Sequence, residues 1–442
     1  MKLPMPPPDP AVSRKLMAGV LALGTYHELD DSTYLPWDEL RYRPVPEILG
    51  SDADHELWWA VLMWSRRARR RNLGILQSNG EPFGLVLTDR ILKASEQIAR
   101  ETGGRLGLPE DVLGPSDRNQ YIVRSLVEEA ITSSQLEGAS TSRRVAKEML
   151  DSGREPVNKS ELMIVNNYVA MQRIRDEAKN ALTPAFVLEL HRILTDGTLD
   201  DPEDAGRLET PDHERVAVWD NELKIHTPPP AEQLPDRLHR LCDFANGKLA
   251  PEVYLPPVVR AVVVHFMAGY DHYFADGNGR TARALFYWSM LHEGYWLSQY
   301  VTISKILRKA PSRYSLAYRH TEDDDGDLTY FIHHQLDVIL RAIRELNEYI
   351  DAKGHELRSV RSALRGQAHD LNQRQLQALE EAVKDDSGLL TVKEHAGHFG
   401  VSGETARADL GDLERRGYLV RSKAGKQFVW KPAPGLAGLL GR

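Results

Sequence analysis

The sequence predicts a mainly helical protein with an N-terminal helical region, one internal β-hairpin and a C-terminal winged helix-turn-helix domain. Apolar residues recur at helical spacing through most of residues 119–350, whereas a strict two-residue alternation is confined to 215–227. After residue 371, three short helical segments precede two short strands, which is the order of elements in a winged helix-turn-helix. These patterns define the fold class before any residue is given a function.

Composition limits the class of protein. For 442 residues, a soft prior of roughly 150 residues per domain predicts about three domains. Hydrophobic residues make up 41% and charged residues 27%, which excludes a collagen-like or mostly disordered chain. Because the net charge is −8, any contact with nucleic acid must be local. The single cysteine, Cys242, fits the cytoplasm, and no stretch approaches the roughly 18 apolar residues of a membrane span.

The chain divides into five segments that differ in composition and in the spacing of apolar residues. They are an N-terminal arm and helical region (1–114), a helical core (115–350), a polar connector helix (351–370), the winged helix-turn-helix (371–432) and a tail (433–442). The N-terminal region contains a run of basic residues at 66–71, and one explanation of such a run is a surface that binds RNA or a membrane. We interpret this run as a solvated helix end.

The elements of the first two segments follow from the spacing of apolar residues. Helices are expected at 56–71, 89–112, 119–137, 158–179, 184–196, 231–246, 256–271, 280–293, 311–320 and 327–350. Thr183 and Pro184 form a suitable cap and first turn for one of them. The alternating stretch 215–227 predicts a hairpin that turns at Asp220 and ends before three prolines.

The segment 272–283 concentrates residues suited to binding phosphate. Gly277 and Gly279 flank Asn278 just before an apolar helix, and glycines allow the backbone to approach a ligand closely. Backbone amides at a helix start favour anions. Arg280 and Arg283 lie three residues apart, so both can face the same side of the first turn.

Two further side chains extend this segment to nucleotide chemistry. Asp276 offers a hard oxygen ligand for Mg²⁺ beside a polyphosphate, and His272 has the ordinary pKa of a base that works near neutrality. The alternative is a glycine-rich turn with surface arginines. The convergence of several demanding residue types within twelve positions argues against that alternative.

This segment resembles the signature of the Fic family, His-Pro-Phe-x-(Asp/Glu)-Gly-Asn-Gly-Arg-x-x-Arg, over a core of residues 115–350. The one departure is Tyr273 in place of proline, which removes a source of loop rigidity. The resemblance implies a protein adenylyltransferase that transfers AMP from ATP to a Tyr, Ser or Thr hydroxyl of a target protein or of itself. It implies that His272 is the catalytic base and that Asp276 holds Mg²⁺. The implied nucleotide-binding residues are Phe274, Gly277, Asn278, Gly279, Arg280 and Arg283.

The same resemblance gives the hairpin a role. In the family such a flap aligns the target chain by strand addition, and an ordinary packed hairpin is the alternative. The implied target-docking residues are Val216, Val218, Lys224 and Ile225. Before the flap, Gly206-Arg207 leads into Glu209, where family members commonly show Gly-x-x-Arg.

Residues 133–138 resemble the family's inhibitory motif, (Ser/Thr)-x-x-x-Glu-(Gly/Asn), at the end of a predicted inhibitory helix (119–138). The implied inhibitory residues are Ser133, Glu137 and Gly138. Because the motif precedes the core, the chain resembles the subclass of the family with an N-terminal inhibitory motif. A carboxylate at a helix end can bind an arginine with two hydrogen bonds, so Glu137 is expected to pair with Arg283 in the place of the γ-phosphate. Ser133 is expected to bond Asn278. The alternative is a solvated glutamate at a helix C-terminus.

The winged helix-turn-helix suggests a second class of function. Its helices are expected at 371–384, 391–399 and 402–416, and its strands at 418–420 and 427–430. Seven Lys or Arg and four acids within 402–431 give this part a net charge of +3, which favours DNA or another acidic surface. A DNA-binding regulator whose Fic-like core senses a nucleotide or partner is therefore the alternative. The intact set of His272, Asp276 and Arg283 favours the enzyme, and a homodimer is a further expectation.

The remaining histidines, the acidic run and two tyrosines are given no catalytic role. His265, His333 and His334 are expected to serve packing rather than to bind a metal. The acidic run 323–325 is interpreted as a solvated loop. Tyr314 and Tyr318 are candidates for the wall of a nucleobase pocket.

Overall fold

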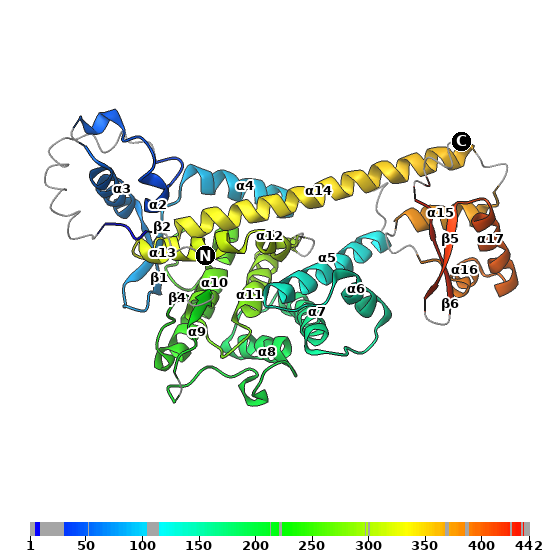
Figure 1. The fold of residues 1–442 in the computed structure, drawn as a ribbon, viewed down its shortest axis with the longest axis horizontal. Helices are drawn as coiled ribbons and strands as arrows, with labels where there is room; N and C mark the ends of the chain where they lie inside the picture. The colour runs from blue at the N-terminus through cyan, green and yellow to red at the C-terminus, as the bar shows by residue number, and fades with distance from the viewer. Residues whose placement is uncertain are drawn as a thin grey trace. The chain divides into compact units, whose positions relative to one another are not determined.

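The computed structural model describes residues 5–8, 31–51, 53–103, 115–212, 214–220, 223–296, 298, 301–366, 371–384, 389–424, 427–434 and 436. The chain forms two compact units, one of Met1–Leu106 with Tyr121–Ile343 and one of Gly107–Gln120 with Arg344–Arg442 (Figure 1). Most of the predicted arm and tail lies outside the described residues. None of the helices within those ranges is long and apolar enough to cross a membrane.

The N-terminal part of the first unit contains helices and a hairpin. Its elements are α2 (Trp37–Leu40), the short η2 (Glu47–Leu49), α3 (His55–Arg69), β1 (Arg71–Leu76), β2 (Pro82–Leu85) and α4 (Asp89–Gly103). Asp54 caps α3 by accepting from the amide of Leu57, and Trp37, Trp58 and Trp59 pack in one apolar cluster. The antiparallel pair β1–β2 was not predicted.

The basic run 66–71 is not a simple solvated helix end. Arg66 is fully buried, and its guanidinium lies 2.5 Å from a carboxylate oxygen of Asp31 and 2.6 Å from the Tyr330 hydroxyl. Arg70 pairs with Asp327 at 3.0 Å. The interpretation as solvated side chains was therefore wrong for these two arginines, which instead bind the Tyr330 hydroxyl and the Asp327 carboxylate.

The acidic run 323–325 also differs from the expectation. Asp324 is buried and accepts a hydrogen bond of 2.9 Å from the Tyr330 hydroxyl, so the run is not a fully solvated loop. Burial raises the pKa of this carboxyl, and the nearby Asp327 raises it further. Asp325, by contrast, has an exposed side chain that pairs with Arg67.

The Fic-like core is helical. It consists of α5 (Pro115–Leu136), α6 (Arg143–Ser152), α7 (Lys159–Glu177), α8 (Pro184–Thr195), η3 (Pro202–Asp204), η4 (Ala231–Gln233), α9 (Leu234–Ala245), α10 (Pro257–Asp271), α11 (Asn278–His292), α12 (Ile303–Lys309), α13 (Pro311–Asp323) and α14 (Thr329–Gly366). Helices α10 and α11 lie side by side at its centre and are buried along most of their length (Figure 1). The loop between them, 272–277, buries Tyr273 and Phe274 and leaves Asp276 exposed.

Local sequence accounts for several of these boundaries. Thr183 accepts from the amide of Phe186 and Pro184 occupies the first turn, as expected for the start of α8. Helix α14 runs without interruption to Gly366, so the connector predicted at 351–370 continues the preceding helix instead of starting a new one. Helices α6 and α12 were not predicted.

The predicted internal hairpin is present as β3 (Val218–Asp220) and β4 (Leu223–His226), which pair antiparallel with Val218 opposite His226. Its two turn residues lie outside the described ranges. Val216 precedes β3 and is 40% exposed, so its assignment to a strand was wrong.

The second unit contains the predicted winged helix-turn-helix. Its elements are α15 (Gln373–Lys384), α16 (Val392–Phe399), α17 (Gly403–Arg415), β5 (Leu419–Ala424) and β6 (Gln427–Pro432). Ser402 caps α17 by accepting from the amide of Thr405. Leu379, Leu410, Leu413 and Trp430 share one apolar core, which packs the helices against the antiparallel wing.

Candidate functional site

The signature segment forms the loop between α10 and α11. Helix α10 ends at Asp271 because His272 adopts a left-handed conformation with φ of +48°, which is uncommon for a residue with a side chain. Asn278 closes the loop, since its side chain accepts from the Phe274 amide at 3.0 Å and donates to the Phe274 carbonyl at 2.6 Å. Gly277 precedes α11 without a capping side chain, so the first amides of α11 can face an anion.

His272 lines a cavity of about 210 Å³ with Glu137, Gly279, Tyr314 and Tyr318. Its Nδ1 atom is buried and has no hydrogen-bond partner among the described residues. Burial, together with the nearby His226 and Arg215, lowers the pKa of His272 to about 3. The imidazole is therefore neutral near pH 7 and can accept a proton.

Arg283 pairs with Glu137, which lines this cavity, while Arg319 is the arginine that lines the cavity itself. The buried guanidinium of Arg283 donates from Nε to Ser133 Oγ at 2.8 Å, and from Nη2 to the Ser133 carbonyl at 3.1 Å. The same Nη2 atom lies 2.9 Å from Glu137 Oε1. The structure thus brings Glu137 and Arg283 together. The expected bond from Ser133 to Asn278 is wrong, because the Ser133 hydroxyl faces Arg283 and the Asn278 amide is bonded within its own loop.

Two glycines allow the inhibitory segment to reach the loop. Gly138 has φ of +92° and turns the chain directly after α5. At Gly279, a Cβ atom would collide with Glu137 Oε1 and lie 2.9 Å from its carboxylate carbon. Glycine at 279 therefore leaves the space that the Glu137 carboxylate occupies.

Arg280 and Asp276 differ in their exposure. Arg280 is buried and donates to the Leu194 carbonyl at 2.8 Å, while its Nε has no partner within the part of the chain that the structure describes. The Asp276 side chain is 57% exposed, and one oxygen accepts from the Gly277 amide at 2.5 Å. Its other oxygen lies 3.8 Å from Arg280 Nη2.

The donor set fits Mg²⁺ only if the metal shares ligands with a substrate. Within the described ranges, no three His, Cys, Asp or Glu side chains are grouped to hold a metal ion. Mg²⁺ commonly uses one or two carboxylates together with substrate phosphates and water. The exposed carboxylate of Asp276, beside the open amides of α11, fits that mode of binding.

His191 is a residue that sequence reasoning missed. Its ring stacks on Phe274 with centroids 3.7 Å apart and planes at 4°, which places Phe274 in the core beneath the loop. The Gly206 amide donates to Nδ1 at 2.9 Å, so Nε2 carries the proton and donates to the Asp276 carbonyl at 2.8 Å. Burial lowers the pKa of His191 to about 4, which keeps this arrangement neutral. In the sequence it is one histidine on a helix and gives no signal.

The flap residues divide into two groups. Val218 and Ile225 line the cavity with His272, whereas Lys224 is exposed and lines no part of it. Val216 lines a separate hollow of about 290 Å³ beside Ala275. The structure therefore places two of the four predicted docking residues in the same cavity as His272.

His226 anchors the flap and was also missed. One ring nitrogen lies 2.7 Å from the Tyr270 carbonyl, and the other lies 3.0 Å from Glu322 Oε2. These bonds tie β4 to α10 and α13 beside His272. The sequence signal was weak, because a histidine at the end of a strand is common.

The aromatic wall of the cavity contains both predicted tyrosines. Tyr314 and Tyr318 line it, and the Tyr314 hydroxyl lies 2.8 Å from Nε2 of the buried His265. His265 and His333 pack among aromatic rings, as expected. Burial lowers the pKa of each to about 3.

Comparisons with known proteins agree with this geometry. Residues 181–290 match the model of the Fic/DOC family, and residues 375–430 match that of the DeoR-like helix-turn-helix domain. The chain is similar in fold to a Fic family protein from Desulfovibrio desulfuricans G20, with a TM-score of 0.51 and 19% identity, over 79% of this chain and 97% of that one. The protein therefore carries a helical Fic domain and a C-terminal winged helix-turn-helix domain.

Two relatives are similar over about a quarter of this chain. Protein adenylyltransferase fic-1 of Caenorhabditis elegans is 31% identical over 109 residues, which are 25% of this chain and 19% of the relative. Protein adenylyltransferase Fic of Nematostella vectensis is 31% identical over 119 residues, which are 27% of this chain and 25% of the relative. The chain thus spans a quarter or less of the length of these relatives.

Proposed function

We propose that the protein is an autoinhibited adenylyltransferase that transfers AMP from ATP to a Tyr, Ser or Thr hydroxyl of a target protein or of itself. The observation that carries this proposal is the cavity that a neutral histidine, His272, shares with Glu137, a carboxylate already paired with the buried Arg283. The names of the two relatives, both adenylyltransferases, support the type of reaction.

In the proposed reaction, the oxygen of the target hydroxyl bonds to the α-phosphorus of ATP, and pyrophosphate leaves. His272 takes the proton of that hydroxyl. The first amides of α11 and the guanidinium of Arg283 face the phosphates, which fixes their position and offsets their charge. Mg²⁺ held by Asp276 would neutralise further phosphate charge. Val218 and Ile225 would place the target chain beside His272.

The low pKa of His272 results mainly from the burial of its ring. A base with a pKa of about 3 is weak, because burial disfavours its charged form. The negative charge of a bound triphosphate would favour the protonated imidazole and raise this pKa towards the working range. Substrate binding would thereby strengthen the base that the reaction uses.

Inhibition follows from charge and space together. The Glu137 carboxylate pairs with Nη2 of Arg283 and lies against Gly279. It thereby takes the space and the cation that the terminal phosphate of ATP would otherwise use. Two anions cannot share one buried cation without repulsion, so ATP would bind in an unproductive position while Glu137 is present. We infer that the segment ending in Glu137 acts as an inhibitor within the same chain.

The test is intact-mass spectrometry of the Glu137→Gly variant after incubation with ATP and Mg²⁺. We expect additions of one AMP mass, few or none in the unmodified sequence, and none in the double variant Glu137→Gly/His272→Ala, which should remain folded. Absence of any addition in Glu137→Gly, towards itself and towards added proteins, would contradict the proposal. It would favour a DNA-binding regulator whose core senses a nucleotide.

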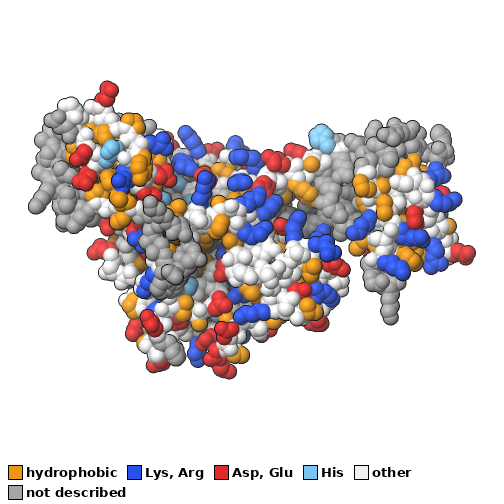
Figure 2. All heavy atoms as spheres, in the orientation of Figure 1, with side chains coloured by type: hydrophobic (Ala, Val, Ile, Leu, Met, Phe, Trp, Pro, Cys, Tyr) orange, Lys and Arg blue, Asp and Glu red, His pale blue; other side chains and the backbone are white. Residues whose placement is uncertain are grey.

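We also infer that the winged helix binds DNA alongside this activity. Arg407 is exposed on α17, and Arg421 and Lys423 are exposed on β5. Both wing cations lie over the ring of the half-exposed Phe428, at 5.0 and 5.5 Å from its centroid. Figure 2 shows Lys and Arg side chains on the visible face of this domain. A cytoplasmic location and a homodimer remain predictions.

A further inference from the structure

The residue before the catalytic histidine is a buried carboxylate held from two sides. Asp271, at the end of α10, is 1% exposed. Arg237 Nε lies 2.7 Å from Asp271 Oδ1, and the Tyr273 hydroxyl donates to Asp271 Oδ2 at 2.7 Å. Tyr273 is itself buried and occupies the place where the family signature has proline. Its hydroxyl therefore adds a constraint to the loop where proline would have fixed the backbone.

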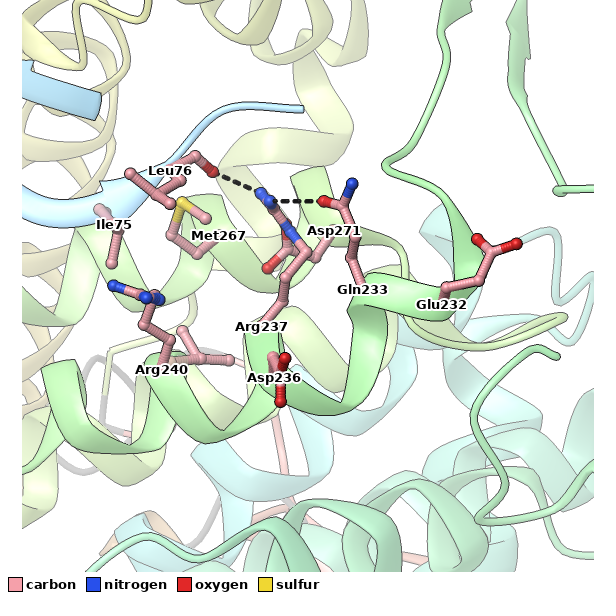
Figure 3. Close-up of a pocket in the computed structure, with 10 residues that line it drawn as sticks. Ile75, Leu76, Glu232, Gln233, Asp236, Arg237, Arg240, Met267 and Asp271 are labelled. Carbon is pink, nitrogen blue, oxygen red and sulfur yellow. Dashed lines mark hydrogen bonds and ion pairs between the residues drawn. The ribbon is translucent and has the colours of Figure 1, made fainter. Parts of the chain in front are cut away.

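Arg237 connects this carboxylate to the N-terminal hairpin (Figure 3). It projects from α9, and its Nη2 atom donates to the carbonyl of Leu76, the last residue of β1. Its Nη1 atom donates to the carbonyl of Gln77 at 3.4 Å. One guanidinium thus bridges the backbone after β1 and the last residue of the helix that carries His272.

The backbone on either side of His272 is fixed as well. Arg215 donates to the carbonyl of Asp271 at 2.9 Å and to that of His272 at 3.0 Å. The amide of Glu209 donates to the carbonyl of Tyr273 at 2.9 Å. A residue with φ of +48° persists only where its surroundings over-determine it, and these bonds supply that constraint.

We propose that Arg237 and Tyr273 are positioning residues that hold His272 in its reactive orientation through the Asp271 carboxylate. The β1–β2 hairpin is thereby part of the apparatus for AMP transfer, because Arg237 is anchored on its backbone. This inference rests on the proposed function. It concerns residues that do not touch the substrate and act through a neighbour.

The expected effect is on turnover more than on nucleotide binding. Removing either partner frees one side of Asp271 and lets the backbone at His272 relax, whereas Arg283 and the α11 amides are untouched. A displacement of about 1 Å in a reacting group can reduce the rate on the order of 100-fold. We therefore expect kcat to fall by about 10- to 100-fold, with little change in the KM for ATP.

The kinetic test uses the full chain with Glu137→Gly to relieve inhibition. Arg237→Gln and Tyr273→Phe are compared with Arg240→Gln, which is a matched control. Arg240 lies one turn further along α9 and donates to the carbonyl of Gly74 on β1 at 3.1 Å, whereas the bond to Asp271 is made by Arg237. The first two variants should lose kcat with an unchanged KM for ATP, and Arg240→Gln should keep both. The proposal would be overturned if kcat stayed unchanged in all three variants, or if it fell by the same factor in all three.

A second readout does not depend on activity. Tyr273→Phe removes one hydroxyl and keeps the ring, so it is the variant least able to prevent folding. Nitrogen-15 NMR of the His272 ring should show a changed chemical shift in Tyr273→Phe and Arg237→Gln, and an unchanged one in Arg240→Gln. An unchanged His272 signal in Tyr273→Phe would overturn the positioning role even if no AMP transfer were ever detected. Failure of the proposed function alone would leave the shifted signal in place.

Discussion

The side chain of Ser133 accepts a hydrogen bond of 2.8 Å from Nε of Arg283, so the segment that we propose as inhibitory binds this arginine at two places. The second place is Glu137, at 2.9 Å from Nη2. Ser133 lies on the last turns of α5, and the Ser133 carbonyl also accepts from Nη2. The arginine that would face the terminal phosphate is therefore oriented by the inhibitory segment as well as neutralised by it.

Ser133→Ala should weaken inhibition without abolishing it. The variant loses one charge-assisted hydrogen bond to Arg283, each of which is worth about 1.5–3 kcal/mol when buried, and keeps the ion pair with Glu137. We expect automodification with ATP to rise several-fold, but less than in Glu137→Gly, as measured by intact mass. Ser134→Ala is the matched control, because the Ser134 hydroxyl bonds the Met163 carbonyl and not Arg283. An equal rise in both serine variants would show that helix loosening alone is responsible.

Gly279→Ala should prevent AMP transfer even when inhibition is relieved. A Cβ at this position would lie 3.1 Å from Nη1 of Arg283 and would fill the space that Glu137 now occupies. In the background of Glu137→Gly, the same methyl group would stand where the phosphates approach the start of α11. ATP affinity measured by calorimetry should fall together with transfer. Gly397→Ala, where no atom lies within 4 Å of the added Cβ, should leave both unchanged, and full transfer in Gly279→Ala would refute this reading of the cavity.

The parts of the site that the sequence predicted are those that lie close together along the chain. The loop 272–283 is contiguous, so its residue types alone pointed to phosphate chemistry, and Glu137 followed from the motif around it. The link from Arg237 to Asp271 spans 34 positions and depends on where two helices cross. No periodicity in the sequence specifies where two helices cross. From the sequence alone, an arginine on a helix is expected to lie on the surface.

The N-terminal errors have the same physical origin. Arg66 resembled a solvated side chain because it stands in a basic run, yet its partner Tyr330 is 264 residues away. The β1–β2 hairpin was missed because its strands are short and Gly74 interrupts the first. The Asn79-Gly80 pair between them is a strong turn signal and was the feature that could have revealed it.

The stability of the Fic domain should fall as the pH falls below about 6.5, the ordinary value for histidine. Burial lowers the pKa of His265 to about 3 in the folded state, so the unfolded chain binds the proton more readily between those two values. Folding stability therefore decreases as pH falls through that window, by up to about 1.4 kcal/mol per pH unit for each such histidine. Urea unfolding at a series of pH values measures the slope.

His265→Asn should make that slope shallower, because one buried titrating group is removed. The exposed His239→Asn variant on α9 is the control and should leave the slope as it is. The measurement concerns the change of stability with pH, so a uniform loss of stability in His265→Asn does not affect it. A slope that stays the same in His265→Asn would mean that His265 is charged or exposed in the folded protein.

DNA binding by the winged helix should depend on Arg407 and Lys423. Arg407 is exposed on the second helix of the helix-turn-helix, the element that enters the major groove in this class of domain, and Lys423 lies on the wing. If each contacts a phosphate, its replacement by alanine should weaken binding to any duplex and reduce the slope of log affinity against log salt by about one. If Arg407 instead reads a base edge, its replacement should cost about 1–3 kcal/mol of binding free energy on the preferred sequence only.

The control is Arg144→Ala, which removes the same charge from α6 of the first unit. Salt-dependent titration of labelled DNA separates these outcomes, and the same affinity and slope for Arg407→Ala, Lys423→Ala and Arg144→Ala would indicate that the domain binds a protein surface instead.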